Sequence, residues 1–543
     1  MNFSDFATWF AAAALTAAMF ACGAPLPATE PAKVVHDVVA PPSDVLAQSA
    51  DVTADNAAMA ENDVDAGHDV DAAPANPCDD GDPCNVDTPL AAGSCEYGLS
   101  LGTITMQQLP NYADQARHLE QFAVAPGNII YTRWAADNAK LPPFLAPVVA
   151  AFDRHGKNLW QYAADGTPNA CTNGDTKLRV AGNDAVEVCF TLSAPETGAK
   201  MLGMRVIRFV NGKVAGGKAV AVLGMSQDDL NYQMQDAIGF LNGEVLGIFT
   251  IYRKGPTGTT TSFAMARVDS NGNLLWAKVL PFVGDAGGHC EIKRLGSALL
   301  LSASQVHYGD PEPIGTLNYV FSATGEVLSQ PDSMSASGVY AIDSGAAPPR
   351  TLAWMDGNGL ALHQLAEPAL TLPGETIWQR PYASGWIGGL GQPSLVGFWN
   401  DGVYFLHGFY ASRGDKVDNF YTVYLDSSGQ ERFRKQVPAA VWQTTGRVPV
   451  LFARNRLEIH EAFDKKQQKT SENTALHILD PWGHATCAEA GVCASKTLEE
   501  CLDTDPCTAD DCDPKLGCTH EPLPDDATCN WSTGAKCKKG LCK

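Results

Sequence analysis

The feature that most restricts the fold of this chain is a pair of turn families that repeat in phase. The first family, seen in AFDRHGKNLW at 151–160, recurs at Gly156, Gly212, Gly272, Gly325, Gly374, Gly429 and Gly483. The second family is centred on Gly127, Gly182, Gly243, Gly296, Gly357, Gly402 and Asn455. Each second-family turn precedes the next first-family turn by 29, 30, 29, 29, 17, 27 and 28 residues. Such phasing indicates seven copies of one supersecondary unit.

Each unit reads as four strands: a strand, a tight turn, a strand, a longer loop, a strand, a tight turn and a strand. A four-stranded unit cannot bury both of its faces alone, whereas radial packing of such sheets does so. The expected fold is therefore all-β, a seven-bladed β-propeller with four-stranded blades over 98–486. The segment LGTITMQQ at 101–108 is expected to close the ring by joining the last blade, and the 17-residue distance predicts a shortened fifth unit.

The turn signature itself resembles a known superfamily. AFDRHGKNLW (151–160) and VDSNGNLLW (268–276) resemble the repeats of pyrroloquinoline-quinone-like propellers, which include quinoprotein dehydrogenases and non-enzymatic outer-membrane assembly lipoproteins. The resemblance covers roughly 100–486 and implies a propeller. The quinoproteins place a disulfide of adjacent cysteines against their cofactor, and this chain has no Cys-Cys pair, so we expect the non-enzymatic type and no cofactor.

Twelve of the sixteen cysteines fall in two short acidic modules, 78–97 and 487–543. They are Cys78, Cys84, Cys95, Cys487, Cys493, Cys501, Cys507, Cys512, Cys518, Cys529, Cys537 and Cys542. Disulfides and an oxidising compartment are the favoured interpretation, with zinc as the alternative. The spacings lack the Cys-x-x-Cys knuckle of zinc sites, so we expect no metal. The run CLDTDPCTADDCDPKLGCTHEP resembles the cysteine-rich repeat of slime-mould extracellular matrix proteins.

The number of cysteines in each module predicts how the modules pair. Three in the first and nine in the second are both odd, and together they make twelve. Because propeller closure brings the chain ends together, we expect a bridge from Cys84 or Cys95 to Cys487 or Cys493. Of the propeller cysteines Cys171, Cys189 and Cys290, one should be left outside a disulfide.

The N-terminus indicates export. Residues 1–22 read as a signal peptide whose apolar stretch is short for a membrane span. The stretch ends at Cys22, in a context that resembles a bacterial lipoprotein box, so Cys22 is the expected lipidation site; a plain signal peptide is the alternative. Residues 23–77 are rich in Ala, Pro and Asp and lack aromatic side chains, which predicts a disordered acidic tether.

Charge excludes one class of partner. Of the formal charge of −23, segment 23–77 contributes −9 and each cysteine module −5, so 98–486 is left near −3 once Asp5 is counted. A nucleic acid is therefore not an expected partner, because binding to phosphates rests on clustered Lys and Arg. No nucleophile elbow, phosphate loop or zinc-protease helix occurs in the sequence, which favours a non-enzymatic protein.

The long loops between strands share one rim of a propeller, opposite the tight turns. The candidate ligand-binding residues on that rim are Tyr232, Asp228, Asp229, His289, Trp386 and Trp442, with packing inside the core as the alternative for the aromatic ones. Exposed aromatic side chains at a loop rim suit a glycan or peptide ligand. The sequence thus predicts an exported surface or envelope lipoprotein that binds a protein or glycan and contacts the membrane only through its lipid anchor. The alternative is a propeller-type hydrolase or lyase acting on extracellular polymers, with Asp228, Asp229 and His289 as its candidate residues.

Overall fold

The computed structural model describes most of the chain from Cys78 onward, within a compact unit that spans Ala72–Lys543. The described residues are 78–89, 95–105, 108–109, 116–136, 146–163, 176–193, 201–224, 226, 228–255, 258–280, 284–285, 290–295, 298–305, 315–329, 339–343, 350–355, 359–365, 374–381, 395–399, 402–410, 417–436, 450–453, 456–460, 475–484, 486–530 and 533–543. The predicted signal peptide, Cys22 and the tether lie outside them.

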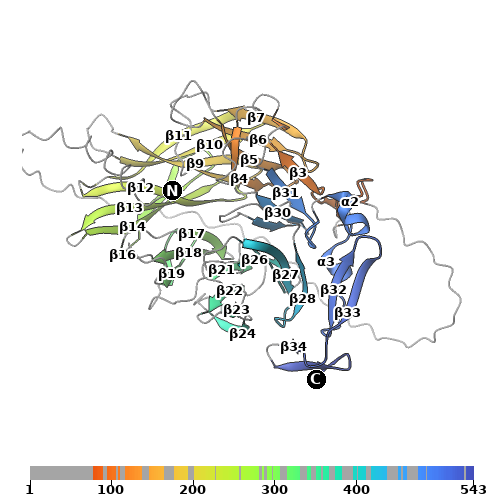
Figure 1. Ribbon diagram of the computed structural model, residues 1–543. Helices are drawn as coiled ribbons and strands as arrows, with labels where there is room; N and C mark the ends of the chain where they lie inside the picture. The colour runs from red at the N-terminus through yellow and green to blue at the C-terminus, as the bar shows by residue number, and fades with distance from the viewer. Residues whose placement is uncertain are drawn as a thin grey trace, which may run out of the picture. The chain divides into compact units, whose positions relative to one another are not determined.

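Seven four-stranded antiparallel meanders make up the body of the protein (Figure 1). Blade 1 is β4 (Ala116–Val124), β5 (Ile130–Ala136), β6 (Ala146–Phe152) and β7 (Asn158–Ala163). Blade 2 is β8 (Lys177–Ala181), β9 (Asp184–Ser193), β10 (Met201–Val210) and β11 (Lys213–Gly224). Blade 3 is β12 (Asp229–Gly239), β13 (Val245–Gly255), β14 (Gly258–Val268) and β15 (Leu274–Val279), and the short β16 (Gly284–Asp285) also pairs with β14.

The remaining blades repeat the pattern. Blade 4 is β17 (Cys290–Leu295), β18 (Ala298–Gln305), β19 (Gly315–Phe321) and β20 (Val327–Ser329). Blade 5 is β21 (Val339–Asp343), β22 (Arg350–Met355), β23 (Gly359–Gln364) and β24 (Glu375–Pro381), and blade 6 is β25 (Leu395–Trp399), β26 (Gly402–Tyr410), β27 (Val417–Leu425) and β28 (Glu431–Gln436). Blade 7 combines β29 (Val450–Ala453), β30 (Arg456–His460) and β31 (Ala475–Leu479) with β3 (Gly102–Thr105) from the start of the chain.

The blades follow one another around a closed ring. The first strand of each blade lies beside the first strand of the next, in the order β4, β8, β12, β17, β21, β25 and β29, and β31 lies beside β4. Strand β3 pairs with β31 from Gly102↔Ile478 to Thr105↔Ala475, which confirms the expected closure. A buried cluster spans this junction and includes Ile104 and Ile478 from blade 7 with Trp134 from blade 1. The protein is therefore a seven-bladed β-propeller.

The Asp and Gly of the first turn family have the same roles in each hairpin turn described below. In blade 1, the Asp153 carboxylate accepts hydrogen bonds from the backbone N–H groups of His155 and Lys157 at 3.0 and 2.9 Å. The Gly156 N–H donates to the Asp153 carbonyl at 3.0 Å, and Gly156 has φ +76°. That left-handed conformation favours glycine. Asp269, Asp426 and Asp480 accept the same pair of bonds in their turns.

The aromatic residue that follows these turns packs against the next blade. A Cβ on Gly212 of blade 2 would lie 2.9 Å from Trp160 of blade 1. Trp276 meets Gly325, and Trp378 meets Gly429, in the same way. Each of these glycines leaves room for an indole ring from the preceding blade, so the repeated Gly and Trp form the contact between neighbouring blades.

Blade 5 corrects one expectation. It has four strands like the others, so the prediction of a shortened fifth unit is wrong. The strand bounds place position 357 between β22 and β23, the second and third strands, rather than between the first and second. The sequence has another glycine, Gly345, 29 residues before Gly374 and between β21 and β22, so the spacing of the other units is kept.

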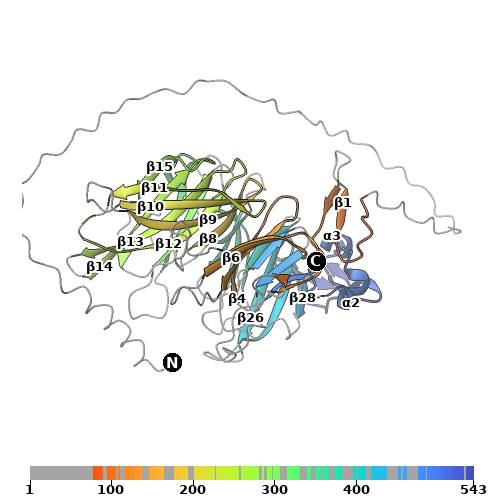
Figure 2. The same cartoon turned by 90° about the horizontal axis from the view of Figure 1, so that it is seen from above.

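The cysteine-rich modules are small and carry their own secondary structure (Figure 2). The first pairs β1 (Asp87–Pro89) with β2 (Cys95–Tyr97). The second contains α2 (Cys487–Ala490), the 3-10 helix η4 (Gly491–Cys493), α3 (Leu498–Cys501), β32 (Thr508–Asp513), β33 (Gly517–Pro522), β34 (Thr528–Asn530), β35 (Ala535–Lys538) and β36 (Leu541–Cys542). Among the described residues, no helix is long and apolar enough to cross a membrane.

Candidate functional site

The described part of the predicted rim site lies at the start of β12, where the chain enters blade 3. The Asp229 carboxylate accepts hydrogen bonds from Arg253 Nε at 2.6 Å, from the Ser226 N–H at 2.7 Å and from the Tyr232 hydroxyl. Burial alone would raise the pKa of Asp229, but the hydrogen bonds from Tyr232 and Ser226 and the charge of Arg253 outweigh it and hold the pKa below its ordinary value. Asp229 is therefore an ionised, fully bonded carboxylate.

The predicted rim residues divide between core and surface. Tyr232 is 4% exposed and packs in the core between blades 2 and 3 with Met204 and Phe249, while its hydroxyl donates to Asp229. Asp228 is exposed, and its carbonyl accepts the Lys254 N–H at 2.8 Å. The structure thus brings Asp228, Asp229 and Tyr232 together. His289, Trp386 and Trp442 lie outside the described residues, so a ligand role for the rim stays a prediction.

All twelve module cysteines are in disulfides. The pairs are Cys78–Cys95, Cys84–Cys487, Cys493–Cys512, Cys501–Cys518, Cys507–Cys537 and Cys529–Cys542. Cys84–Cys487 confirms the expected bridge between the two modules, across a sequence separation of 403 residues. Within the propeller, Cys189 is disulfide-bonded and Cys290 is a buried thiol, and Cys171 lies outside the described residues.

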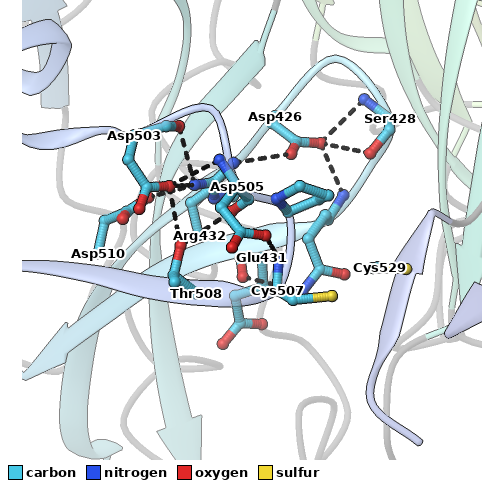
Figure 3. A network of polar contacts seen from close by, with 12 residues as sticks. Asp426, Ser428, Glu431, Arg432, Asp503, Asp505, Cys507, Thr508, Asp510 and Cys529 are labelled. Carbon is cyan, nitrogen blue, oxygen red and sulfur yellow. Dashed lines mark hydrogen bonds and ion pairs between the residues drawn. The ribbon is translucent and has the colours of Figure 1, made fainter. Parts of the chain in front are cut away.

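Each module also holds the propeller through an arginine, a feature that the sequence reasoning missed. In the C-terminal module, Arg432 of β28 forms a network of polar contacts with Asp503 and with Asp510 of β32 (Figure 3). Its Nη2 donates to Asp503 Oδ1 at 2.8 Å, to the Asp503 carbonyl at 3.0 Å and to Asp510 Oδ2 at 2.7 Å. The side chains of Arg432 and Asp510 are 6% and 1% exposed. Beside them, Lys435 pairs with Asp511 at 2.6 Å.

Burial raises the pKa of Asp510. The hydrogen bond from His520 and the charge of Arg432 lower that pKa and offset the effect of burial only in part. Ligand atoms of Asp503, Asp510 and His520 lie within 4.8 Å of one another, as in a metal site. The guanidinium of Arg432 is bonded to both carboxylates and supplies the positive charge that a cation would bring.

The N-terminal module makes the matching contact with blade 1. Arg154, in the tight turn between β6 and β7, donates from Nη2 to Asp80 Oδ2. His155 Nδ1 lies 3.2 Å from Asp82 Oδ2 and 2.8 Å from Ser100 Oγ. The Ser100 N–H donates to the Arg154 carbonyl at 3.0 Å. The module is therefore fixed to the tight-turn end of the blade.

No protein-family model matches the chain, and no curated protein matches it. Among solved structures it is similar to the acylaminoacyl peptidase of Pyrococcus horikoshii, at 11% identity over 68% of this chain and 52% of that chain, with a TM-score of 0.38. It is also similar to the β-propeller domain of the Trilobed protease from Pyrococcus furiosus (8%, 67% and 93%, TM-score 0.34) and to an α-L-arabinanase of Penicillium chrysogenum (8%, 70% and 98%, TM-score 0.34).

The chain spans about half the length of the acylaminoacyl peptidases that it matches. Of these structures, the Trilobed protease domain is a β-propeller by name, and all of them are at most 11% identical to this chain. Strand pairing and the order of the blades around the ring define the propeller.

Proposed function

We propose that this protein is an exported surface or envelope lipoprotein, anchored through Cys22, whose propeller binds a protein or glycan on its long-loop rim. The observation that carries the proposal is where the modules attach. Arg154 lies in a tight turn of blade 1, and the tight turn at Asp480–His484 leads directly into α2. In an antiparallel meander, these turns lie at the rim opposite the one that carries the longer connections. Among the described residues, the turns that meet the modules lie at one rim, which supports placing the proposed ligand at the other.

Two features support export and a non-enzymatic role. Six disulfides join the modules internally and to each other, and such bonds persist in oxidising compartments. The turn signature resembles the non-enzymatic lipoproteins of the quinone-like propeller superfamily, and the chain lacks the adjacent cysteines of its dehydrogenases. The likeness of the modules to slime-mould matrix repeats agrees with a place outside the cell.

The enzyme alternative gains no support from the described rim residues. A glycoside hydrolase that works with two carboxyl groups needs one of them to keep its proton near neutral pH. Asp229 has a pKa held below its ordinary value and is bonded on both oxygens. It is suited to holding Tyr232 and Arg253 in place rather than to donating a proton.

The experiment measures binding of the full-length mature protein to immobilised oligosaccharides and to envelope proteins from the source cell. We expect at least one specific ligand, with a dissociation constant that rises about tenfold or more in a triple variant carrying His289→Ala, Trp386→Ala and Trp442→Ala. Leu241→Ala is the matched control, because Leu241 is 75% exposed in a tight turn on the opposite rim. A triple variant that binds as tightly as the control would place the ligand elsewhere, and turnover of a bound polymer would favour the enzyme.

The lipid anchor is tested separately. Cells fed an alkyne-tagged fatty acid should label the wild-type protein and fail to label Cys22→Ala. Equal labelling of the two proteins, or none of either, would refute the anchor while leaving the binding proposal to its own test.

A further inference from the structure

The two cysteine modules match in the spacing of three cysteines, in one disulfide and in one strand pair. Adding 423 to Cys78, Cys84 and Cys95 gives Cys501, Cys507 and Cys518. The same shift relates the disulfide Cys78–Cys95 to Cys501–Cys518. It also relates the strand pairing Asp87↔Tyr97 to Asp510↔His520. The first module is thus a shorter copy of part of the second.

The aspartates at matching positions make matching hydrogen bonds within each copy. The Asp82 N–H donates to Asp80 Oδ1 at 2.9 Å, and the Asp505 N–H donates to Asp503 Oδ1 at 2.9 Å. The next bonds match as well: the N–H groups of the following cysteines, Cys84 and Cys507, donate to Asp82 and Asp505 at 2.9 and 2.8 Å. These bonds orient both carboxylates, but the two arginines approach them differently. Arg154 bonds to the other oxygen, Asp80 Oδ2, whereas Arg432 bonds to the same oxygen, Asp503 Oδ1.

Each copy uses the same aspartate to bind one arginine of the propeller. Asp80 binds Arg154, and Asp503, which lies 423 residues later, binds Arg432. In the second copy, Asp510 completes the contact from β32. The equivalent residue of the first copy, Asp87, accepts the Asp80 N–H at 3.0 Å and feels the charge of Arg154.

The two arginines, in contrast, are not equivalent within the propeller. Arg154 stands two residues before Gly156, and Arg432 stands three residues after Gly429, although both glycines belong to the same turn family. One comes from a turn and the other from an outer strand. The two copies of the module therefore bind arginines at two different positions of a blade. What the two binding partners have in common is the guanidinium group.

We propose that each cysteine-rich module is an arginine socket, a binding site for a guanidinium group. It is built on the aspartate two residues after the first cysteine and is completed in the second copy by the aspartate nine residues after it. A guanidinium is planar, weakly hydrated and carries several N–H donors, which suits it to buried ion pairs. In both copies the bonds to the module aspartates come from Nη2. A lysine ammonium is a compact, strongly hydrated charge, so it is less suited to such a site. The proposal is independent of the proposed ligand on the long-loop rim.

The test is guanidinium rescue in the full-length protein. The reactivity of individual carboxylates is measured with a diazo labelling reagent and mass spectrometry. Asp510 is 1% exposed in its side chain, so it should be protected in the wild type. Arg432→Ala should raise its labelling rate on the order of 100-fold, as expected when a buried, bonded charge loses its partner. Millimolar ethylguanidinium should restore protection, and ethylammonium at the same ionic strength should not.

Three controls decide the outcome. Lys435→Ala removes a neighbouring, more exposed ion pair on the same strand and should change Asp510 labelling less than twofold. Asp480, which is fully buried in blade 7, reports whether the propeller stays folded. Arg432→Lys keeps the charge, and we expect Asp510 in this variant to be labelled as fast as in Arg432→Ala. If Arg432→Ala also exposes Asp480, the test of guanidinium specificity uses Arg432→Lys instead.

The N-terminal copy provides an independent arm. Arg154→Ala should increase labelling of Asp80, again with rescue by ethylguanidinium alone. Protection of Asp510 by Arg432→Lys, or equal rescue by the two cations, would show a site for any cation rather than a guanidinium socket. An unchanged Asp80 in Arg154→Ala would show that the two modules do not share the site.

Discussion

The disulfide between Cys84 and Cys487 should contribute more to stability than any short-range disulfide of the modules. It closes a loop of 403 residues, whereas Cys78–Cys95 closes one of 17. In the chain-entropy description, a cross-link stabilises by restricting the unfolded chain, and the effect grows with 1.5R times the logarithm of loop length. The long loop then contributes about 6 kcal/mol and the short one about 3 kcal/mol. The difference, 1.5RT ln(403/17), is about 2.8 kcal/mol.

Two double variants isolate this difference. Cys84→Ala with Cys487→Ala removes the long-range bond, and Cys78→Ala with Cys95→Ala removes the short one. Urea unfolding without reductant, followed by tryptophan fluorescence and circular dichroism, gives the free energy of unfolding of each. We expect the first pair to lose about 2.8 kcal/mol more than the second. Equal losses would refute the reasoning, because the bond would then act through local packing rather than through closure of the ring.

Three further predictions concern the propeller. Gly325→Ala should lower the free energy of unfolding by about 2–4 kcal/mol, because a Cβ there would lie 2.9 Å from Trp276. Gly127→Ala should lower it by about 1 kcal/mol, because both glycines have positive φ but no atom lies within 4 Å of a Cβ on Gly127. Equal losses in calorimetry would mean that the Trp276 contact adds nothing. Burial lowers the pKa of His363 below 6.5, so the unfolded chain takes up the proton first, and stability should fall as pH drops below 6.5. His363→Gln should flatten that slope in melts between pH 7 and 5, and an unchanged slope would contradict the assignment. Asp229→Asn should cost about 1–3 kcal/mol at pH 7. The pKa of Asp229 is lowered, so its contribution is lost as pH falls through its folded value, and wild type and variant should converge at acid pH; a constant gap would refute this.

Much of the fold was readable from the chain because its signals are local and repeated. The Asp and Gly of each tight turn satisfy the bonds of a single hairpin, so they recur wherever that hairpin recurs. The exception is instructive: Gly357 resembles a member of the second turn family, but β22 and β23 flank it. A glycine marks a turn without saying which two strands the turn joins.

The rim site was less readable. An aromatic residue near a loop can face a ligand or the neighbouring blade. Tyr232 faces the neighbouring blade, whose sheet covers it. Asp229 reads as a candidate acid in sequence, yet Arg253, which bonds to it, is 24 residues away on another strand. The loop composition carries no signal for either outcome.

The sequence by itself determined the number of blades, the strand that closes the ring and the need for a bridge between the modules, because spacing and an odd cysteine count are properties of the chain. Only the tertiary structure decided what the module aspartates bind. Asp80 and Asp503 are related by a constant shift in sequence, but Arg154 and Arg432 are not. Ion pairs between distant segments depend on which surfaces the folded sheets bring together, and no local pattern records that.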